Sequence, residues 1–376
     1  MLKQNLGRIL TNMPGWRTDH KIVVIESDDW GSIRMPSREV YEDCLKSGYQ
    51  VDLNAYERYD SLASEKDLEL FFEVLTSFRD KNGNHPVITA NCVVANPDFE
   101  KIKTDGFKNY HYELITETFK RYPGHAGCFN LWKQGMSARI FHPQYHCREH
   151  VNVSRFMDAL QKGDRDVLFG FNYQMPGCIP LEDGAYGSDY IEAIKYNSVK
   201  DKEEKLSYFL EGLDLFEKLF GYRSESIIPP NYIWSSDFNK PVYEKKVMYF
   251  QGLRKMREPV PGGKDKYNHL YMGKKNDLGQ RYLIRNVQFE PSLFRLNIKD
   301  PVRHCLNEMA LAFLMRKPAI ICTHRLNYVG FIHESNRDRN LKFLKEVLTR
   351  ALARWPEIEF MTTNQLGYLI LQNKEL

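Results

Sequence analysis

The feature that most constrains the fold is a regular alternation between short apolar runs and longer segments with helical periodicity. Runs rich in β-branched and apolar residues occupy residues 21–27, 86–94, 138–141, 167–171, 226–228, 247–251, 282–289, 319–323 and 357–362. Segments with helical periodicity occupy residues 65–79, 110–121, 153–162, 202–220, 302–315 and 336–353. Strands that alternate with helices of this length predict βαβ units and a mostly parallel sheet, either open or closed into a barrel.

The segment 65–79 shows the helical pattern clearly. Its large apolar residues recur at intervals of three and four, at Leu68, Phe71, Phe72, Leu75 and Phe78. This spacing places them on one face of an α-helix. In a parallel sheet, ligands collect at the carboxyl ends of the strands, so we expect reactive residues directly after the strand runs.

The size and composition of the chain narrow the class of protein. With 376 residues, 42% of them hydrophobic and 27% charged, the chain is long enough for a substantial core and is not disordered. We find no repeats and no long linker rich in Pro, Gly or Ser. Two polar stretches, 175–188 and 259–279, lack periodicity and are predicted to be long loops above the strand ends. We therefore expect one domain with elaborated loops.

Charge and cysteine usage predict the partners and the compartment. The excess of 53 Lys and Arg over 49 Asp and Glu is only +4, which does not indicate a nucleic acid or a polybasic membrane anchor. The seven cysteines are scattered, with no CxxC pair, which favours a reducing compartment. Neither a signal peptide nor an apolar run long enough to span a bilayer is visible. We predict a soluble, cytoplasmic protein with no membrane or nucleic-acid partner.

The first candidate motif follows the strand run 21–27 and contains the adjacent carboxylates Asp28 and Asp29, then Trp30 and Gly31. Two neighbouring side chains at a strand end can point to different sides. One carboxylate could therefore bind a cation while the other accepts a proton. The alternative is an ordinary turn, for which Asp and Gly are common residues.

The second motif holds three histidines within nine residues, His142, His146 and His150. The spacing of His146 and His150 would place both on one face of a helical turn, where two imidazoles can reach one metal ion. Imidazole together with carboxylate suits Zn²⁺ and related divalent ions. The alternative is a group of helix histidines that bind nothing. Cys147 would face elsewhere, and we predict that it is not a ligand.

Two further segments follow strand runs. Ile228-Pro229-Pro230-Asn231-Tyr232 offers an extended backbone, an amide and an aromatic side chain, although a rigid loop covering the core would have the same sequence. The run 319–323 ends directly before His324. A single histidine of this kind is more often structural than catalytic, so its position at a strand end is what makes it a candidate.

Taken in order, these four segments resemble the polysaccharide deacetylase family, the carbohydrate esterases of the glycoside hydrolase/deacetylase superfamily that share the chitooligosaccharide deacetylase homology domain. The family pattern is an Asp-Asp strand end, H-[ST]-x-x-H, an R-P-P-Y-like loop, and a strand ending in a catalytic His. This chain departs from it at Cys147 in place of Ser or Thr, at Ile228 in place of Arg, and at Asn231 in place of Tyr. The resemblance spans residues 21–370.

The resemblance implies a fold and a division of the chain. The fold would be a distorted (β/α) barrel with about seven mostly parallel strands. The barrel would occupy residues 21–372, after an N-terminal extension over residues 1–20.

The resemblance also implies a chemistry, which is removal of an acetyl group from an acetylated sugar or oligosaccharide. Asp29, His146 and His150 would hold a divalent metal, with zinc as the first candidate. Asp28 would be the general base on a metal-bound water, and His324 the general acid toward the leaving amine or alcohol. Whether the acetyl group is carried on nitrogen or on oxygen is left open.

Substrate contacts and supporting residues are less closely defined by the resemblance. Trp30, Asn231, Tyr232 and Trp234 are candidate sugar-binding residues, although aromatic residues at such positions are as often part of the core. The oxyanion would be held by the metal and by the backbone N–H of Asn231 or Tyr232. The arginine missing at Ile228 would be replaced by Arg34, Arg254 or Arg325. No residue of the fourth motif, which tunes the catalytic His, is assigned from the sequence.

Two other functions remain open at this stage. A glycoside hydrolase of the same barrel superfamily would use a carboxylate pair drawn from Glu26, Asp28 and Glu149, with His146 as a substrate contact. A catalytically inactive carbohydrate-binding protein could keep the same fold. The missing arginine favours the inactive protein, and the complete set of Asp28, Asp29, His146, His150 and His324 argues against it.

Overall fold

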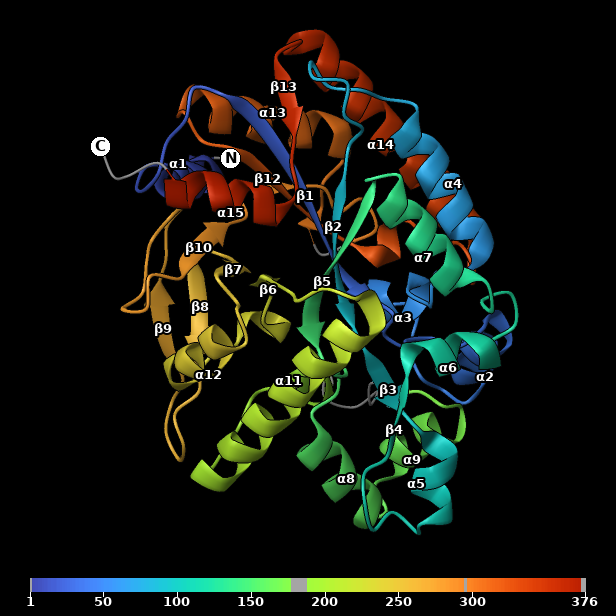
Figure 1. Ribbon diagram of the computed structural model, residues 1–376. Helices are drawn as coiled ribbons and strands as arrows, with labels where there is room; N and C mark the ends of the chain where they lie inside the picture. The colour runs from blue at the N-terminus through green and yellow to red at the C-terminus, as the bar shows by residue number, and fades with distance from the viewer. Residues whose placement is uncertain (1, 177–187, 294–295, 373–376) are drawn as a thin grey trace.

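The computed structural model describes residues 2–176, 188–293 and 296–372, and it is organised around one large parallel sheet (Figure 1). Nine described strands form this sheet in the order β10-β7-β6-β5-β2-β1-β12-β11, with β13 paired to the start of β1. The strands are β1 (Lys21–Trp30), β2 (Ile88–Val93), β5 (Phe141–Cys147), β6 (Ser226–Ile227), β7 (Tyr249–Gly252), β10 (Arg281–Ile284), β11 (Val287–Gln288), β12 (Ala319–His324) and β13 (Ile358–Phe360).

The two ends of the sheet meet on one short segment of the chain. Strand β10 pairs with β7 at one end of the sheet, and β11 pairs with β12 at the other. Between β10 and β11 lie Arg285, whose N–H donates to Gly252 O at 2.9 Å, and Asn286, whose N–H donates to Ile320 O at 3.2 Å. The sheet therefore curls round on itself, and the expected distorted (β/α) barrel is confirmed.

Helices cover the outside of the barrel, with α4, α7 and α14 along one flank and α11 across another (Figure 1). The longer helices are α1 (Leu2–Asn12), α2 (Arg38–Lys46), α4 (Glu65–Thr76), α7 (Cys128–Ser137), α8 (Val153–Gln161), α9 (Arg165–Asn172), α11 (Val199–Phe220), α13 (Pro301–Leu314), α14 (Glu334–Arg354) and α15 (Thr363–Gln372). The shorter ones are α3 (Ala55–Tyr59), α5 (Phe99–Thr104), α6 (Ile115–Arg121), α10 (Ser188–Ile191) and α12 (Asn239–Glu244).

Two small antiparallel pairs and three 3₁₀ turns complete the described elements. The pairs are β3 (Ala95–Pro97) with β4 (Tyr112–Leu114), and β8 (Lys255–Glu258) with β9 (Lys266–His269). The turns are η1 (Pro230–Tyr232), η2 (Ser236–Phe238) and η4 (Arg325–Asn327).

Local sequence explains why the central elements form where they do. After Lys21, strand β1 runs through apolar residues that are buried on both faces, as a parallel strand between the barrel interior and the outer helices requires. Helix α4 begins with a capping box, in which Ser64 and Asp67 each satisfy a backbone N–H of the other. Helix α11 ends at Gly221, whose φ of 77° is the left-handed conformation that suits glycine at a helix end.

The structure corrects several sequence-based boundaries. Residues 167–171 lie in helix α9 rather than in a strand, and Val167, Gly170 and Phe171 form the buried face of that helix. The strand expected at 138–141 is shifted to β5, so that His146 lies inside a strand. The expected helix 110–121 begins with strand β4, and the expected loop 259–279 contains β9. Most of the other expected loop, 175–188, lies outside the described residues.

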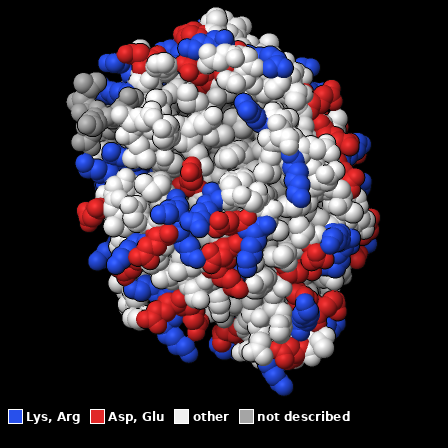
Figure 2. Space-filling view, in the orientation of Figure 1, with Lys and Arg blue, Asp and Glu red and all other residues white. Residues whose placement is uncertain are grey.

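Figure 2 shows positive and negative side chains interspersed over one face, with no large area of a single sign. That distribution is consistent with the small net charge of the chain. Among the helices of the described residues, none has the length and apolar character needed to cross a membrane.

Candidate metal centre and active site

The two adjacent carboxylates of the first motif point to different sides because β1 is irregular at its end. The register between β1 and β2 shifts between Ser27 and Trp30, and Asp29 has a φ of 72°. Bulges of this kind redirect side chains at the rim of a barrel. Asp28 consequently faces Arg285 and Asp29 faces the histidines, which is the separation that the sequence predicted.

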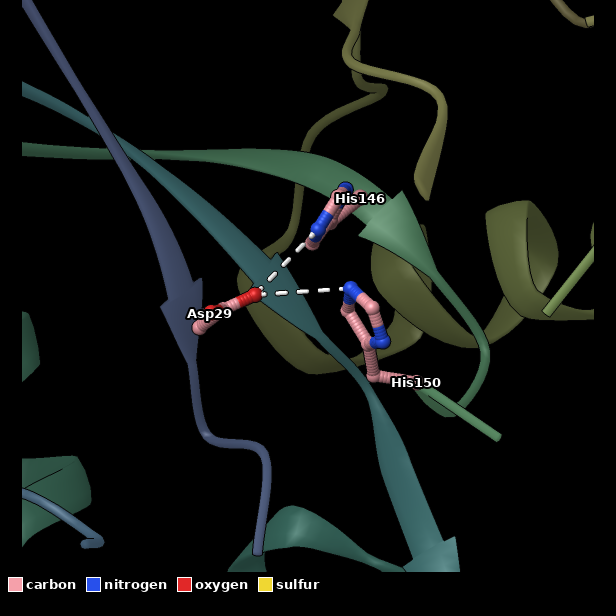
Figure 3. Close-up of side chains that lie close together, drawn as sticks. All are labelled: Asp29, His146 and His150. Carbon is pink, nitrogen blue, oxygen red and sulfur yellow. Dashed lines mark ion pairs between the residues drawn. The ribbon is translucent and has the colours of Figure 1, made fainter. Parts of the chain in front are cut away.

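Asp29, His146 and His150 converge on one point at the carboxyl end of the sheet (Figure 3). The Nε2 atoms of both imidazoles lie 3.5 Å from Oδ1 of Asp29, and all three side chains are buried. Two ligands about 2.1 Å from a tetrahedral Zn²⁺ are about 3.4 Å apart. The three atoms are therefore spaced as ligands of a single divalent ion would be.

Hydrogen bonding and burial leave the imidazoles ready to bind a cation. Nδ1 of His146 donates to Ile228 O at 2.7 Å, which leaves the lone pair of Nε2 facing Asp29. Burial lowers the pKa of His150 to about 3, so this imidazole is neutral at physiological pH. Burial alone would raise the pKa of Asp29, but Arg34 and His146 hold it well below its usual range. The site thus presents the Nε2 atoms of two imidazoles and one carboxylate.

The triad is not built as the sequence spacing suggested. His146 is in strand β5 and His150 lies in the loop that follows it, so the predicted helical turn carrying both is wrong. A strand end and a sharp loop bring the rings together at 4.9 Å instead. Cys147 is buried and does not belong to the triad of Asp29 and the two histidines.

Asp28 is held by an arginine that the sequence did not identify. Nη1 and Nη2 of Arg285 lie 2.6 and 2.7 Å from the two carboxylate oxygens of Asp28, and Asn91 donates to Oδ1 at 2.8 Å. Burial would raise the pKa of Asp28, but Arg285 outweighs it and lowers the pKa to about 2. Asp28 is therefore ionised and fixed in orientation.

Arg285 takes the place of the arginine that the family pattern has at Ile228. The three expected replacements, Arg34, Arg254 and Arg325, make no contact with Asp28 among the described residues, and that prediction is wrong. Arg34 lies beside Asp29 at 3.5 Å, and Arg325 donates to Asp60 at 3.0 Å. The place of Arg285, between the two strands that close the barrel, directs its side chain into the barrel's end.

His324 ends strand β12 and faces the cavity beside Asp28. Its Nε2 lies 3.7 Å from Oδ2 of Asp28, and its Nδ1 lies 2.5 Å from Oε1 of Glu290, whose Oε2 accepts from Asn327 at 2.7 Å. Burial opposes a charge on His324, but Glu290 raises its pKa to about 9. His324 is therefore an imidazolium at neutral pH. Glu290 is thus the acidic partner of His324, a contact for which no residue was assigned from the sequence.

The four expected substrate contacts divide into two groups. Trp30 and Trp234 are 1% and 4% exposed and pack in the core, so their prediction as sugar-stacking surfaces is wrong. Asn231 and Tyr232 do line the cavity, in the left-handed conformation with φ of 54° and 56°. The backbone N–H of Tyr232 donates to Pro229 O at 3.0 Å. This N–H is therefore already used within the loop and is not directed at an oxyanion in the cavity.

One cavity of about 1190 Å³ contains the triad, Asp28 and His324. Aliphatic residues and tyrosines, including Met35, Tyr56 and Leu253, form part of its wall. The carboxylates Glu26 and Glu149 do not line it, and each is paired with an arginine at 2.6 Å, Glu26 with Arg285 and Glu149 with Arg148. A carboxylate pair of the kind a glycoside hydrolase would need is therefore not available from these two residues.

No protein-family model matches the chain, and no curated protein matches it. Among solved structures, the chain is similar in fold to a 4-alpha-glucanotransferase from Thermococcus litoralis, at 11% identity over 94% of this chain and 40% of that chain, with a TM-score of 0.45. It is also similar to the alpha-amylase AmyC from Thermotoga maritima, at 10% identity over 95% and 76% of the two chains, with a TM-score of 0.46. The peptidoglycan deacetylase PdaC from Bacillus subtilis matches at 8% identity over 93% and 91%, with a TM-score of 0.36. This chain thus spans about two fifths of the length of the glucanotransferase.

Proposed function

We propose that the protein is a metal-dependent deacetylase that hydrolyses an acetyl amide or ester on a carbohydrate. The observation that carries the proposal is the placement of a cation-binding triad, Asp29, His146 and His150, in the same cavity as the Asp28 and His324 pair. The carbohydrate class is inferred from the resemblance of the four sequence motifs to polysaccharide deacetylases.

Asp29, His146 and His150 would hold the cation, for which their donor atoms and spacing are suited. When bound, a divalent ion lowers the pKa of water toward neutrality and polarises a carbonyl group. The remaining chemistry belongs to side chains of this protein.

Asp28 and His324 divide the proton transfers between them. Asp28 is ionised and directs Oδ2 toward His324, so it is placed to accept a proton from the attacking water. His324 is protonated and supplies a proton to the leaving nitrogen or oxygen, while Glu290 keeps its imidazole in position. Arg285 holds Asp28 through two hydrogen bonds and so prevents rotation of the carboxylate.

Arg285 also weakens the case for an inactive binding protein. That alternative was favoured by the lack of an arginine at Ile228 in the third motif. In the structure a buried arginine, Arg285, reaches Asp28 from the segment between β10 and β11.

The proposal is tested by acetate release from a panel of acetylated sugars, with and without a chelator, alongside metal analysis of the purified protein. We expect about one equivalent of divalent metal and activity that the chelator abolishes. Asp28→Asn is expected to keep the metal and lose turnover by about 10²-fold or more, whereas His150→Ala loses both. Equal loss of metal in the two variants would contradict the assigned roles, and activity that persists in chelator would contradict metal dependence.

A further inference from the structure

A second group of metal-binding side chains lies in the same cavity, apart from the triad. It consists of Glu290, Cys322 and His324, whose ligand atoms all lie within 4.8 Å of one another. We propose that this group is a second cation site, suited to thiophilic ions such as Zn²⁺ and Cd²⁺, and that its occupation blocks the general acid. The binding itself does not depend on the proposed function, whereas the inhibition does.

The donor set matches a thiophilic divalent ion. Thiolate, imidazole and carboxylate are the ligands that Zn²⁺ prefers in proteins. Oε1 of Glu290 lies 2.5 Å from Nδ1 of His324 and 4.0 Å from Sγ of Cys322, so it is close to both other donor atoms. Asn327 holds Oε2 and fixes the orientation of this carboxylate. The Glu290 oxygen therefore has a fixed orientation, and the nitrogen and sulfur donors both lie near it.

The adjustment needed to accept an ion is small. With ligand distances of about 2.1 Å for nitrogen and oxygen and about 2.3 Å for sulfur, tetrahedral geometry separates N from O by about 3.4 Å and S from O by about 3.6 Å. Nδ1 of His324 must therefore withdraw by about 1 Å from Glu290, and Sγ of Cys322 must approach by less than that.

The charges around Cys322 favour a cation despite the nearby arginine. Burial raises the pKa of the Cys322 thiol to about 12, although Nη1 of Arg285, 3.4 Å from Sγ, acts in the opposite direction, so an arriving ion has to displace the thiol proton. The negative charges of Asp28, which pairs with Arg285, and of Glu290, whose Oε1 lies 4.0 Å from Sγ, offset the guanidinium. Cys322 is also partly exposed and lines the cavity, whereas the other described cysteines are buried. An ion can therefore reach it from the cavity.

Occupation of this site would remove the acid that the reaction uses. Binding displaces the proton of the Cys322 thiol and the proton on Nδ1 of His324, and both pass to solvent. The ion then takes the electron pair of Nδ1, which leaves a neutral imidazole whose one remaining proton is on Nε2. That imidazole is a much weaker acid than the imidazolium. The first metal ion would support activity and the second would suppress it.

The test is a titration of the metal-free protein with Cd²⁺, followed by the ultraviolet charge-transfer band of a thiolate bound to cadmium. We expect the band in the unaltered protein and in His150→Ala, which lacks a ligand of the first site. We expect it to vanish in Cys322→Ser, with the affinity for the second equivalent reduced more than about tenfold. Cys147→Ser is the matched control, because Cys147 adjoins the first site, and it should keep the band.

Two results would overturn the proposal. One is the absence of the band in the unaltered protein and in His150→Ala. The other is a band that Cys147→Ser removes and Cys322→Ser leaves intact, because the thiolate would then belong to the first site. Circular dichroism checks folding, and Cys322→Ala serves if the serine variant does not fold. Where deacetylase activity is present, excess Zn²⁺ should inhibit the unaltered protein and not Cys322→Ser.

Discussion

At the scale of single residues, the protonation of His324 is the property that most directly controls the proposed reaction. Glu290 overcomes the effect of burial and raises the pKa of this imidazole to about 9. Because the pKa is raised, the required imidazolium is present below about pH 9 and is lost as the pH rises through that value. We expect kcat to fall along an alkaline limb near pH 9.

Substitution of Glu290 tests this account. In Glu290→Gln, the hydrogen bond to Nδ1 can remain but the negative charge is lost, so the alkaline limb should move down by about 1 to 3 pH units. The measurement is the pH dependence of kcat on an acetylated sugar. Glu308→Gln is the control, because Glu308 lines the same cavity but binds Arg8 instead. An alkaline limb that stays in place in Glu290→Gln would show that His324 is not the titrating acid.

At the scale of elements, the packing of helix α11 on strand β5 supports the second motif. A Cβ atom added at Gly212 would lie 2.0 Å from the hydroxyl of Tyr145 and 2.9 Å from Cβ of Arg148. We expect Gly212→Ala to force α11 away from β5 and to lower the free energy of unfolding by about 1 to 3 kcal/mol. Urea denaturation measures the loss. Gly7→Ala in helix α1, where an added Cβ meets nothing within 4 Å, should be neutral or slightly stabilising.

The helices and strands also differ in how well the sequence predicted them. Helix α4 and strands β1 and β12 were predictable because the spacing of their apolar residues agrees with the burial of those residues. The ends of the two strands then located Asp28, Asp29 and His324. Arg285 and Glu290 were missed although both belong to the predicted strand run 282–289 or follow it directly. Their partners lie more than thirty residues away in sequence, so only the closed barrel shows that this run faces the site.

At the scale of the whole molecule, the proposed metal links segments that are far apart in the sequence. Asp29 lies in β1, while His146 and His150 belong to β5 and the loop after it. The unfolded chain does not hold these ligands together, so a bound ion stabilises the folded state. An ion present at a thousand times its dissociation constant contributes about 4 kcal/mol. Removal of the ion should therefore lower the melting temperature of the entire protein.

The measurement is thermal unfolding of the protein as purified, after chelation, and after Zn²⁺ is restored. We expect chelation to lower Tm by several degrees and Zn²⁺ to restore it, because the ion binds only the folded arrangement of Asp29, His146 and His150. His150→Ala combined with Cys322→Ser should start at the lower Tm and respond to neither treatment, since it can complete neither the triad nor the second group of ligands. His142→Ala is the matched control, because His142 lies in the same strand but outside the triad, and it should keep the full response. If this double variant shifted as much as the unaltered protein, the stabilising ion would have to be bound elsewhere, and the triad would lose its assignment as the metal centre.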